Sequence, residues 1–285
     1  MTTISASQPP ARQHPPAWAV LFAMPLVLFS VLTMLAASLA GMGLIISVSA
    51  TRDQVHRAAL PPGGSVAVAA TDAGVKIEAG PAGQVSVEDW VQVRSLTRAL
   101  ARQALSVYSE STITPTDGGV RIEVRGQRAP DPFETKVDHQ VTIRMPAASG
   151  LKLSGGAGAA DIHDLTGPID VELGAGAVRL LNVTVTSVDR VFASAGAVDV
   201  ENAAIEAGTL DISTGSGAIR VKLPRGTNAT YDVSSANGAI FVKPETGSPI
   251  ALSGSDRSTR GILGAGGTSV VRLRASSGAI DLEVG

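Results

Sequence analysis

Side chains that could bind a metal come together in one short segment, Asp161-Ile-His163-Asp164. Carboxylates and a neutral imidazole are common metal ligands. Only alternate residues of a strand share a face, and no second cluster of such residues is visible in the sequence. We therefore expect an exposed turn at this segment, with no metal and no cofactor.

Motifs for nucleotide or acyl chemistry are absent from the sequence. It has no Gly-x-Ser-x-Gly elbow, no glycine-rich phosphate loop and no dinucleotide fingerprint, and it contains no cysteine. The net charge of -2 argues against a broad nucleic-acid surface. We expect a protein without enzymatic activity. A glycan-active β-helix enzyme is the less favoured alternative, because aromatic residues make up only 3% of the chain.

Three arginines, Arg94, Arg98 and Arg102, recur at intervals of four residues. On a helix they would line one face, where they could contact anionic lipid headgroups or wall polymers. The alternative, which we favour, is a solvated helix face. The helix itself is predicted by Leu96, Leu100, Ala104 and Val107, with Ser95 as its N-cap and a length of about 13 residues.

A five-residue pattern, Gly-Ala-apolar-x-apolar, recurs six times in the C-terminal half, with glycine spacings of 18, 20, 21, 21 and 40 residues. A second short segment precedes each copy, and both segments alternate apolar and polar residues, which is typical of strands. The glycine between them would form a corner with positive φ. The repeated glycines are Gly158, Gly176, Gly196, Gly217, Gly238 and Gly278.

Two short strands and a corner in about 20 residues predict one coil of a β-solenoid, with a β-sandwich as the alternative. The interval of 40 predicts that the Gly/Ser-rich stretch 253–268 replaces one coil with a loop. Asp189 breaks the alternation, because it falls where the other copies carry an apolar residue.

Charged residues at the outward positions test this prediction, because equivalent residues of stacked coils lie about 4.8 Å apart. Two predicted ladders alternate in sign, except where Asp211 meets Asp232 in the second. Alternation favours parallel, in-register stacking. The first ladder is Asp161, Arg179, Asp199, Arg220 and Phe241; the second is Lys152, Asp170, Arg190, Asp211 and Asp232.

The N-terminal part predicts a membrane anchor. Residues 17–50 are apolar apart from scattered Ser and Thr. This stretch is longer than the ~20 residues that a helix needs to cross a bilayer. We predict one transmembrane helix there, preceded by a disordered proline-rich tail at 1–16 and followed by a solenoid domain at 51–285. A cleaved signal peptide ending at Ser38-Leu39-Ala40 is the alternative. Charge does not decide the orientation, because Arg12 opposes Arg52 and Arg57.

The stretch 64–145 predicts further strands of the same sheet, interrupted by the helix, which we expect to cover the open end of the solenoid. Together with Val141-Thr-Ile-Arg-Met-Pro146 and the closing repeat Ser276-Ser-Gly-Ala-Ile-Asp-Leu282, the pattern resembles the bacterial putative adhesin family of membrane-anchored β-solenoids, also called toastrack domains. The resemblance covers about residues 64–285. The family commonly has Ser/Thr-Gly-Asp-Ile where this chain has Gly-Ala-Val/Ile.

The resemblance implies an extracytoplasmic domain without known catalytic residues, acting in adhesion or in sensing stress of the cell envelope. The expected partners are the membrane itself and envelope polymers or neighbouring membrane proteins, not nucleic acid. A self-assembling structural component of the envelope, in which solenoid ends stack between protomers, is the alternative function.

Overall fold

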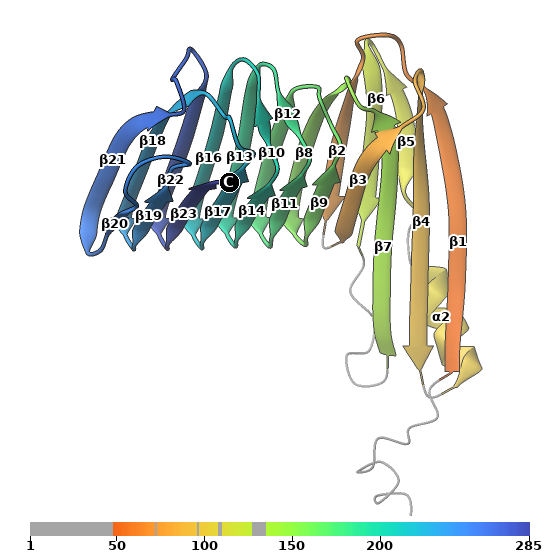
Figure 1. Ribbon diagram of the computed structural model, residues 1–285. Helices are drawn as coiled ribbons and strands as arrows, with labels where there is room; N and C mark the ends of the chain where they lie inside the picture. Colours follow the sequence, from red (N-terminus) through yellow and green to blue (C-terminus); the bar gives the residue numbers. More distant parts are fainter. Residues whose placement is uncertain (1–47, 72, 96, 108–109, 127–134) are drawn as a thin grey trace, which may run out of the picture. The chain divides into compact units, whose positions relative to one another are not determined.

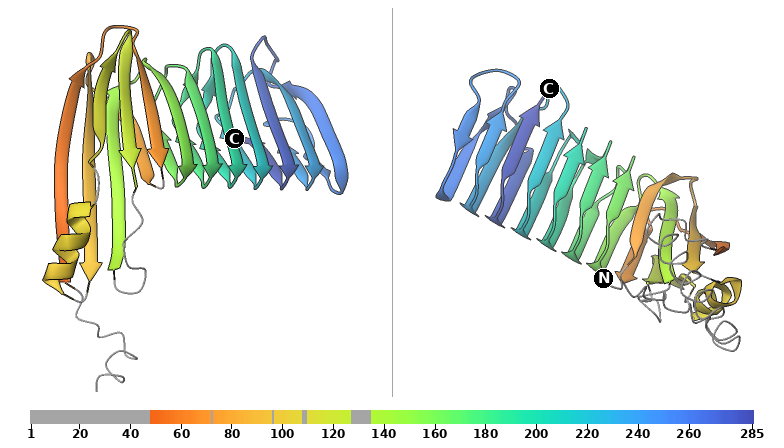
Figure 2. Two further views of the ribbon diagram at one scale, coloured as in Figure 1. Left: turned by 180° about the vertical axis from the view of Figure 1, so that it is seen from behind. Right: turned by 90° about the horizontal axis from the view of Figure 1, so that it is seen from below.

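Two large β-sheets face each other in the computed structural model, which describes residues 48–71, 73–95, 97–107, 110–126 and 135–285. We call the eleven-stranded sheet "sheet A" and the ten-stranded sheet "sheet B". Residues 48–285 form one compact unit. Figures 1 and 2 show the strands of this unit as successive tiers.

The strands of sheet A are, in spatial order, β1 (Val48–Ala59), β4 (Gln84–Ser95), β7 (Thr135–Pro146), β3 (Gly74–Gly80), β9 (Ala160–His163), β11 (Val178–Leu181), β14 (Val198–Glu201), β17 (Ile219–Leu223), β23 (Ile280–Val284), β19 (Ile240–Lys243) and β20 (Ile250–Leu252). Those of sheet B are β21 (Ser255–Leu263), β18 (Ala229–Asn237), β22 (Val270–Ser277), β16 (Thr209–Ser216), β13 (Val188–Ala195), β10 (Ile169–Ala175), β8 (Gly150–Ala157), β2 (Ser65–Thr71), β6 (Gly119–Arg125) and β5 (Thr112–Thr116). A small third sheet pairs β12 (Thr184–Val185) with β15 (Ala204–Ile205).

Each coil contributes one strand to sheet B and the next to sheet A, and neighbouring coils pair in parallel and in register. Val171 of β10, for example, lies between Leu153 of β8 and Val191 of β13. Alternate residues are buried in nearly every strand, so Val, Ile and Leu fill the space between the sheets. The predicted solenoid topology is confirmed for the coils, and the β-sandwich alternative is wrong.

The order of the last coils differs from the sequence order. Strands β22 and β23 return and insert between the coils β16/β17 and β18/β19. The segment predicted as a loop, 253–268, contains β21, which pairs antiparallel with β18. A solenoid of identical coils can accept a returning coil at this position because the parallel ladder continues unchanged on both sides of it.

Both ends of the solenoid are closed by antiparallel strands. At one end β4 pairs antiparallel with β7, β1 with β4, and β5 with β6. At the other end β20 and β21 run antiparallel to β19 and β18. The solenoid edge is therefore capped by strands, not by the helix as the sequence predicted.

The one described helix, α2 (Arg98–Val107), packs beside β1 and β4, where these strands extend beyond the coils (Figure 1). It is shorter than predicted and begins two residues later. Thr97, not Ser95, caps it, since the Thr97 hydroxyl accepts a hydrogen bond from the Leu100 amide at 3.3 Å. Ser95 is the buried last residue of β4.

The buried face of α2 differs from the predicted one. Ala101 and Ala104 pack against Val91 and Val93, whereas Leu100 is 37% exposed. Small alanines let the helix approach the extended strands closely, which the hydrophobic pattern alone does not indicate.

The predicted membrane segment lies almost wholly outside the described residues. Its last three residues, Val48–Ala50, begin strand β1, so a helix over 17–50 is wrong at that end. Across the described ranges no helix is both long enough and apolar enough to cross a membrane.

Candidate functional site

The outer face of sheet B carries a ladder of alternating charges. Asp170 lies opposite Arg190 on the neighbouring strand, and Arg190 lies opposite Asp211 on the next, as predicted. The expected contact of Asp211 with Asp232 is wrong, because the inserted β22 places Arg272 between them. Alternation is thereby restored, and the Arg272 guanidinium lies 3.6 Å from the Asp211 carboxylate.

The outer face of sheet A carries two such ladders. In the first, the inserted β23 places Asp281 between Arg220 and Phe241, which corrects the predicted contact of those two residues. The second was not predicted, and in it Lys222 and Lys243 flank Glu283 on the two neighbouring strands. Alternation on both faces supports the in-register stacking of the whole solenoid.

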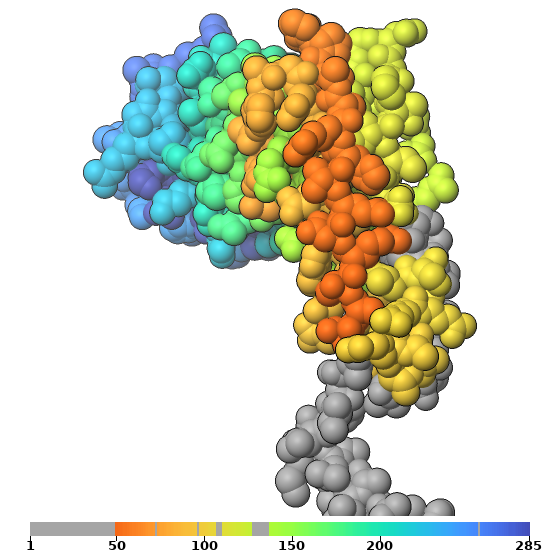
Figure 3. Space-filling view, turned by 90° about the vertical axis from the view of Figure 1, so that its right-hand side faces the viewer, coloured from red at the N-terminus to blue at the C-terminus, as the bar shows by residue number. Residues whose placement is uncertain are grey.

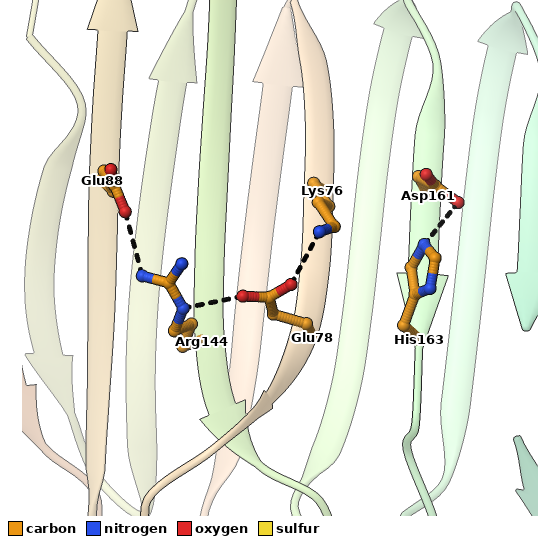
Figure 4. Close-up of polar contacts among 6 residues, drawn as sticks. All are labelled: Lys76, Glu78, Glu88, Arg144, Asp161 and His163. Atoms are coloured by element: carbon orange, nitrogen blue, oxygen red, sulfur yellow. Dashed lines mark hydrogen bonds and ion pairs between the residues drawn. The ribbon is translucent and has the colours of Figure 1, made fainter. Parts of the chain in front are cut away.

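An ion-pair network crosses three strands at the N-terminal end of sheet A (Figure 4). Arg144 of β7 donates to Glu78 of β3 at 2.7 Å and to Glu88 of β4 at 2.9 Å. Lys76 lies 2.8 Å from Glu78. Two cations and two carboxylates thus neutralise one another.

The network holds Lys76, Glu78 and Arg144 in their charged states. The hydrogen bond from Lys76 and those from Arg144 lower the pKa of Glu78, although burial opposes this shift. The Glu88 and Glu78 carboxylates raise the pKa of Arg144. Lys76, whose pKa is raised by Glu78, therefore remains charged at neutral pH, as do Glu78 and Arg144, and none of the three is poised to act as a general acid or base.

The residues considered as a metal cluster separate into two places. His163 Nε2 lies 2.8 Å from Asp161 Oδ1 on the outer face of β9 (Figure 4). Asp164 turns away with a positive φ of 58° and accepts a hydrogen bond from Asn182 at 3.1 Å. Within the described chain no three His, Asp or Glu side chains are grouped to hold a metal.

A buried polar cluster joins β4 to β7 and to the segment before β5. The Asp89 carboxylate accepts hydrogen bonds from the Ser111 amide at 2.9 Å and hydroxyl at 2.8 Å, and Asp89 Oδ1 lies 2.9 Å from His139 Nε2. Burial raises the pKa of Asp89, but the hydrogen bonds from His139 and Ser111 outweigh it, so the pKa lies below its usual value.

This cluster contains the residue types of a hydrolase triad but not its arrangement. The serine contacts the aspartate, whereas a nucleophile would contact the histidine. Asp89 and Ser111 are 1% and 2% exposed, so no substrate reaches them. The cluster stabilises the extension of sheet A. The sequence did not indicate it because its three members lie far apart along the chain.

Asp189, which breaks the apolar alternation, occupies a core position between Ile169 and Leu210. Its Oδ1 accepts a hydrogen bond from the Ile169 amide at 3.1 Å. Burial raises the pKa of Asp189 to about 6, against the smaller opposing effect of that hydrogen bond. The Asp189 carboxylate therefore accepts the hydrogen bond of the Ile169 amide at the point where β10 and β13 begin to pair, in place of a backbone carbonyl.

The repeated glycines form a stack at the corners between sheets B and A. All six have positive φ, from 126° at Gly176 to 159° at Gly238. A Cβ atom on Gly196 would collide with the carbonyl oxygen of Gly176 on the neighbouring coil. Both the backbone conformation and the spacing of coils therefore require glycine here.

A second stack at the opposite corner was missed in the sequence. Asp164, Asn182 and Asn202 adopt positive φ, and their side chains are hydrogen-bonded in series, with Asn202 Nδ2 donating to Asn182 Oδ1 at 2.8 Å. Their spacings of 18 and 20 residues equal those of the first glycines. That shared period was a signal that could have revealed them.

The three arginines do not share a helix face. Arg94 lies on β4, where it donates to Gln92 at 2.8 and 3.1 Å and pairs with Asp138 at 3.6 Å. Arg98 and Arg102 are exposed on α2. The predicted row of three on one helix is wrong, because the strand continues to Ser95.

A shallow groove crosses the outer face of sheet B at the glycine-rich ends of its strands. Two hollows, of about 540 and 650 Å³, meet at the exposed side chain of Phe192. Small residues are needed there because neighbouring strands approach closely: a Cβ on Gly174 would meet the carbonyl of Gly156, and one on Gly215 that of Ser194. The groove is thus lined mainly by Gly, Ala and Ser, with Glu172 on one side of Phe192 and Arg257 and Arg274 on the other.

The fold and its faces define a class: a parallel β-solenoid, closed by antiparallel strands, with charged ladders on both outer faces. The sequence profile of the Toastrack DUF4097 family matches residues 138–283, which are 146 of the 285 residues. The chain belongs to this family, which confirms the resemblance found in the sequence. No curated protein matches the chain.

Two solved structures are similar to this chain. One is described as a putative cell adhesion protein from Clostridium sporogenes, with 12% identity and a TM-score of 0.43, over 83% of this chain and all of that one. The other is described as a putative adhesin from Bacteroides fragilis, with 9% identity and a TM-score of 0.38, over 81% of this chain and 96% of that one.

Proposed function

We propose that this protein is a non-enzymatic, single-pass membrane protein that presents residues 48–285 outside the cytoplasm as an adhesion-type binding domain. The apolar stretch before Val48 would be the anchor, since its length suits a bilayer helix. The polar clusters support the non-enzymatic part of the proposal, because their charges and hydrogen bonds are used within the fold. Stress sensing at the envelope would use the same binding face.

The groove on sheet B carries the proposal. It passes over eight neighbouring strands, from β2 to β21, which corresponds to about 34 Å at the usual strand spacing. A groove of this length suits an extended polymer better than a compact small molecule. Its serines can both donate and accept hydrogen bonds, and the Phe192 ring offers an apolar platform. An extended chain of sugar residues presents both hydroxyls and apolar C–H faces.

The chain offers a matched pair of phenylalanines for the test. Phe192 is 37% exposed on sheet B, in the groove, and Phe241 is 38% exposed on sheet A. The purified protein should be tested for binding to a panel of wall and capsular polysaccharides. We expect Phe192→Ala to weaken binding of the recognised polymer at least about tenfold, which is about 1.4 kcal/mol. Phe241→Ala should bind like the wild type.

Equal affinity of the two variants would remove the groove from the binding site. Release of shortened or unsaturated sugar products during the assay would contradict the non-enzymatic proposal.

A further inference from the structure

Strand β1 forms a long free edge of sheet A. It spans twelve residues and pairs with β4 alone among the described strands. Figure 3 shows β1, in orange, on the surface along its length. A free edge presents unpaired N–H and C=O groups that another strand can bind.

The other three edges are less suited to pairing. Strand β20 has only three residues, and β5 contains Pro115, which has no N–H. Strand β21 carries Arg260, which is already paired with Asp232 at 2.8 Å. The long β1 edge is therefore the one that a partner strand would extend.

The exposed side chains of β1 are arranged symmetrically about Val55. This valine is 54% exposed, with Asp53 two residues before it and Arg57 two residues after it. No ion pair within the described chain engages either charge. The two cannot pair with each other, because four residues of strand separate them by about 13 Å.

A second β1, placed antiparallel with Val55 opposite Val55, matches these features. Asp53 then faces Arg57 of the other copy, twice, and Thr51 faces Ala59. Shifting the register by two residues leaves both charges unpaired. Shifting it by four places Asp53 opposite Asp53 or Arg57 opposite Arg57, which is repulsive. Of these registers only the one centred on Val55 places Asp53 opposite Arg57, and it has the two-fold symmetry of a homodimer.

We propose that two copies of this protein dimerise by antiparallel pairing of their β1 edges about Val55, which joins their sheets A. This interface lies on sheet A and leaves the groove of sheet B free. It is independent of the proposed binding function.

Cysteine cross-linking of the full-length protein in membranes tests the symmetry directly, because the chain contains no native cysteine. With copper phenanthroline as oxidant, Val55→Cys should form a disulfide-linked dimer, because the two thiols meet on the axis. Thr51→Cys is the control, since its two copies would lie about 27 Å apart. Absence of a Val55→Cys cross-link, or an equal yield from Thr51→Cys, would overturn the proposal.

Charge reversal tests the register. The dimer dissociation constant should be measured by analytical ultracentrifugation of the full-length protein in detergent. Asp53→Arg and Arg57→Asp should each raise it at least tenfold, and the double variant should restore it. Arg225→Asp, in an exposed turn, should leave it unchanged. Wild-type protein that stays monomeric at all concentrations, or a double variant no better than the single ones, would overturn the proposal; circular dichroism checks that each variant is folded.

Discussion

At the scale of single residues, Asp189 links the fold to pH. Its pKa is about 6 in the folded protein and 3.8 in an unfolded chain. Between these values the unfolded state loses the proton while the folded state keeps it. The contribution to stability is therefore fully present below pH 3.8 and falls as the pH rises to 6, by about 3 kcal/mol in total.

We expect Asp189→Asn to remove this pH dependence, because asparagine keeps an acceptor for the Ile169 amide but does not titrate. The measurement is the free energy of unfolding by urea from pH 4 to pH 7. Subtracting the variant from the wild type cancels the opposite slope of Asp89, whose pKa is lowered. Parallel curves for the two proteins would show that Asp189 does not hold a proton in the fold.

At the scale of structural elements, the glycine corners set the distance between coils. Gly196→Ala should reduce the free energy of unfolding by at least about 3 kcal/mol, through backbone strain and through the clash with Gly176. Gly83 is the control. It also has a positive φ, of 76°, but an added Cβ there would have no atom within 4 Å. Gly83→Ala should lose about 1–2 kcal/mol, from strain alone. Equal losses at the two positions would contradict a steric role of the stack.

The sequence predicted the coils because a local pattern determines them: a glycine corner between two alternating segments. It did not predict the insertion of β22, because the backbone hydrogen bonds of a parallel, in-register ladder form equally well with any neighbouring coil. The charges could have indicated it, since Arg272 is the residue that separates Asp211 from Asp232. Strand β1 was obscured, because the apolar run before it continues to Ala50.

The candidate site was less predictable than the fold. The ladders follow from the repeat period, so most of their residues were found. The groove depends on how strands of distant coils align, and Phe192 carried no sequence signal of its own. The cluster of Asp89, Ser111 and His139 likewise depends on tertiary contacts alone.

At the scale of the whole molecule, the two sheets have separate expected roles. Sheet B presents the groove proposed for an extended ligand, and the β1 edge of sheet A is proposed to join two copies. A dimer would double the number of binding faces and raise the avidity for a polymer that carries many equivalent sites.

The central claim is that residues 48–285 act as a binding domain displayed outside the cytoplasm. The most direct measurement is protease treatment of intact cells and of spheroplasts that express the full chain with a C-terminal tag. The account predicts loss of the tag while a cytoplasmic control protein stays intact. Complete protection of the tag in both preparations would contradict the account, because the domain would then lie on the cytoplasmic side.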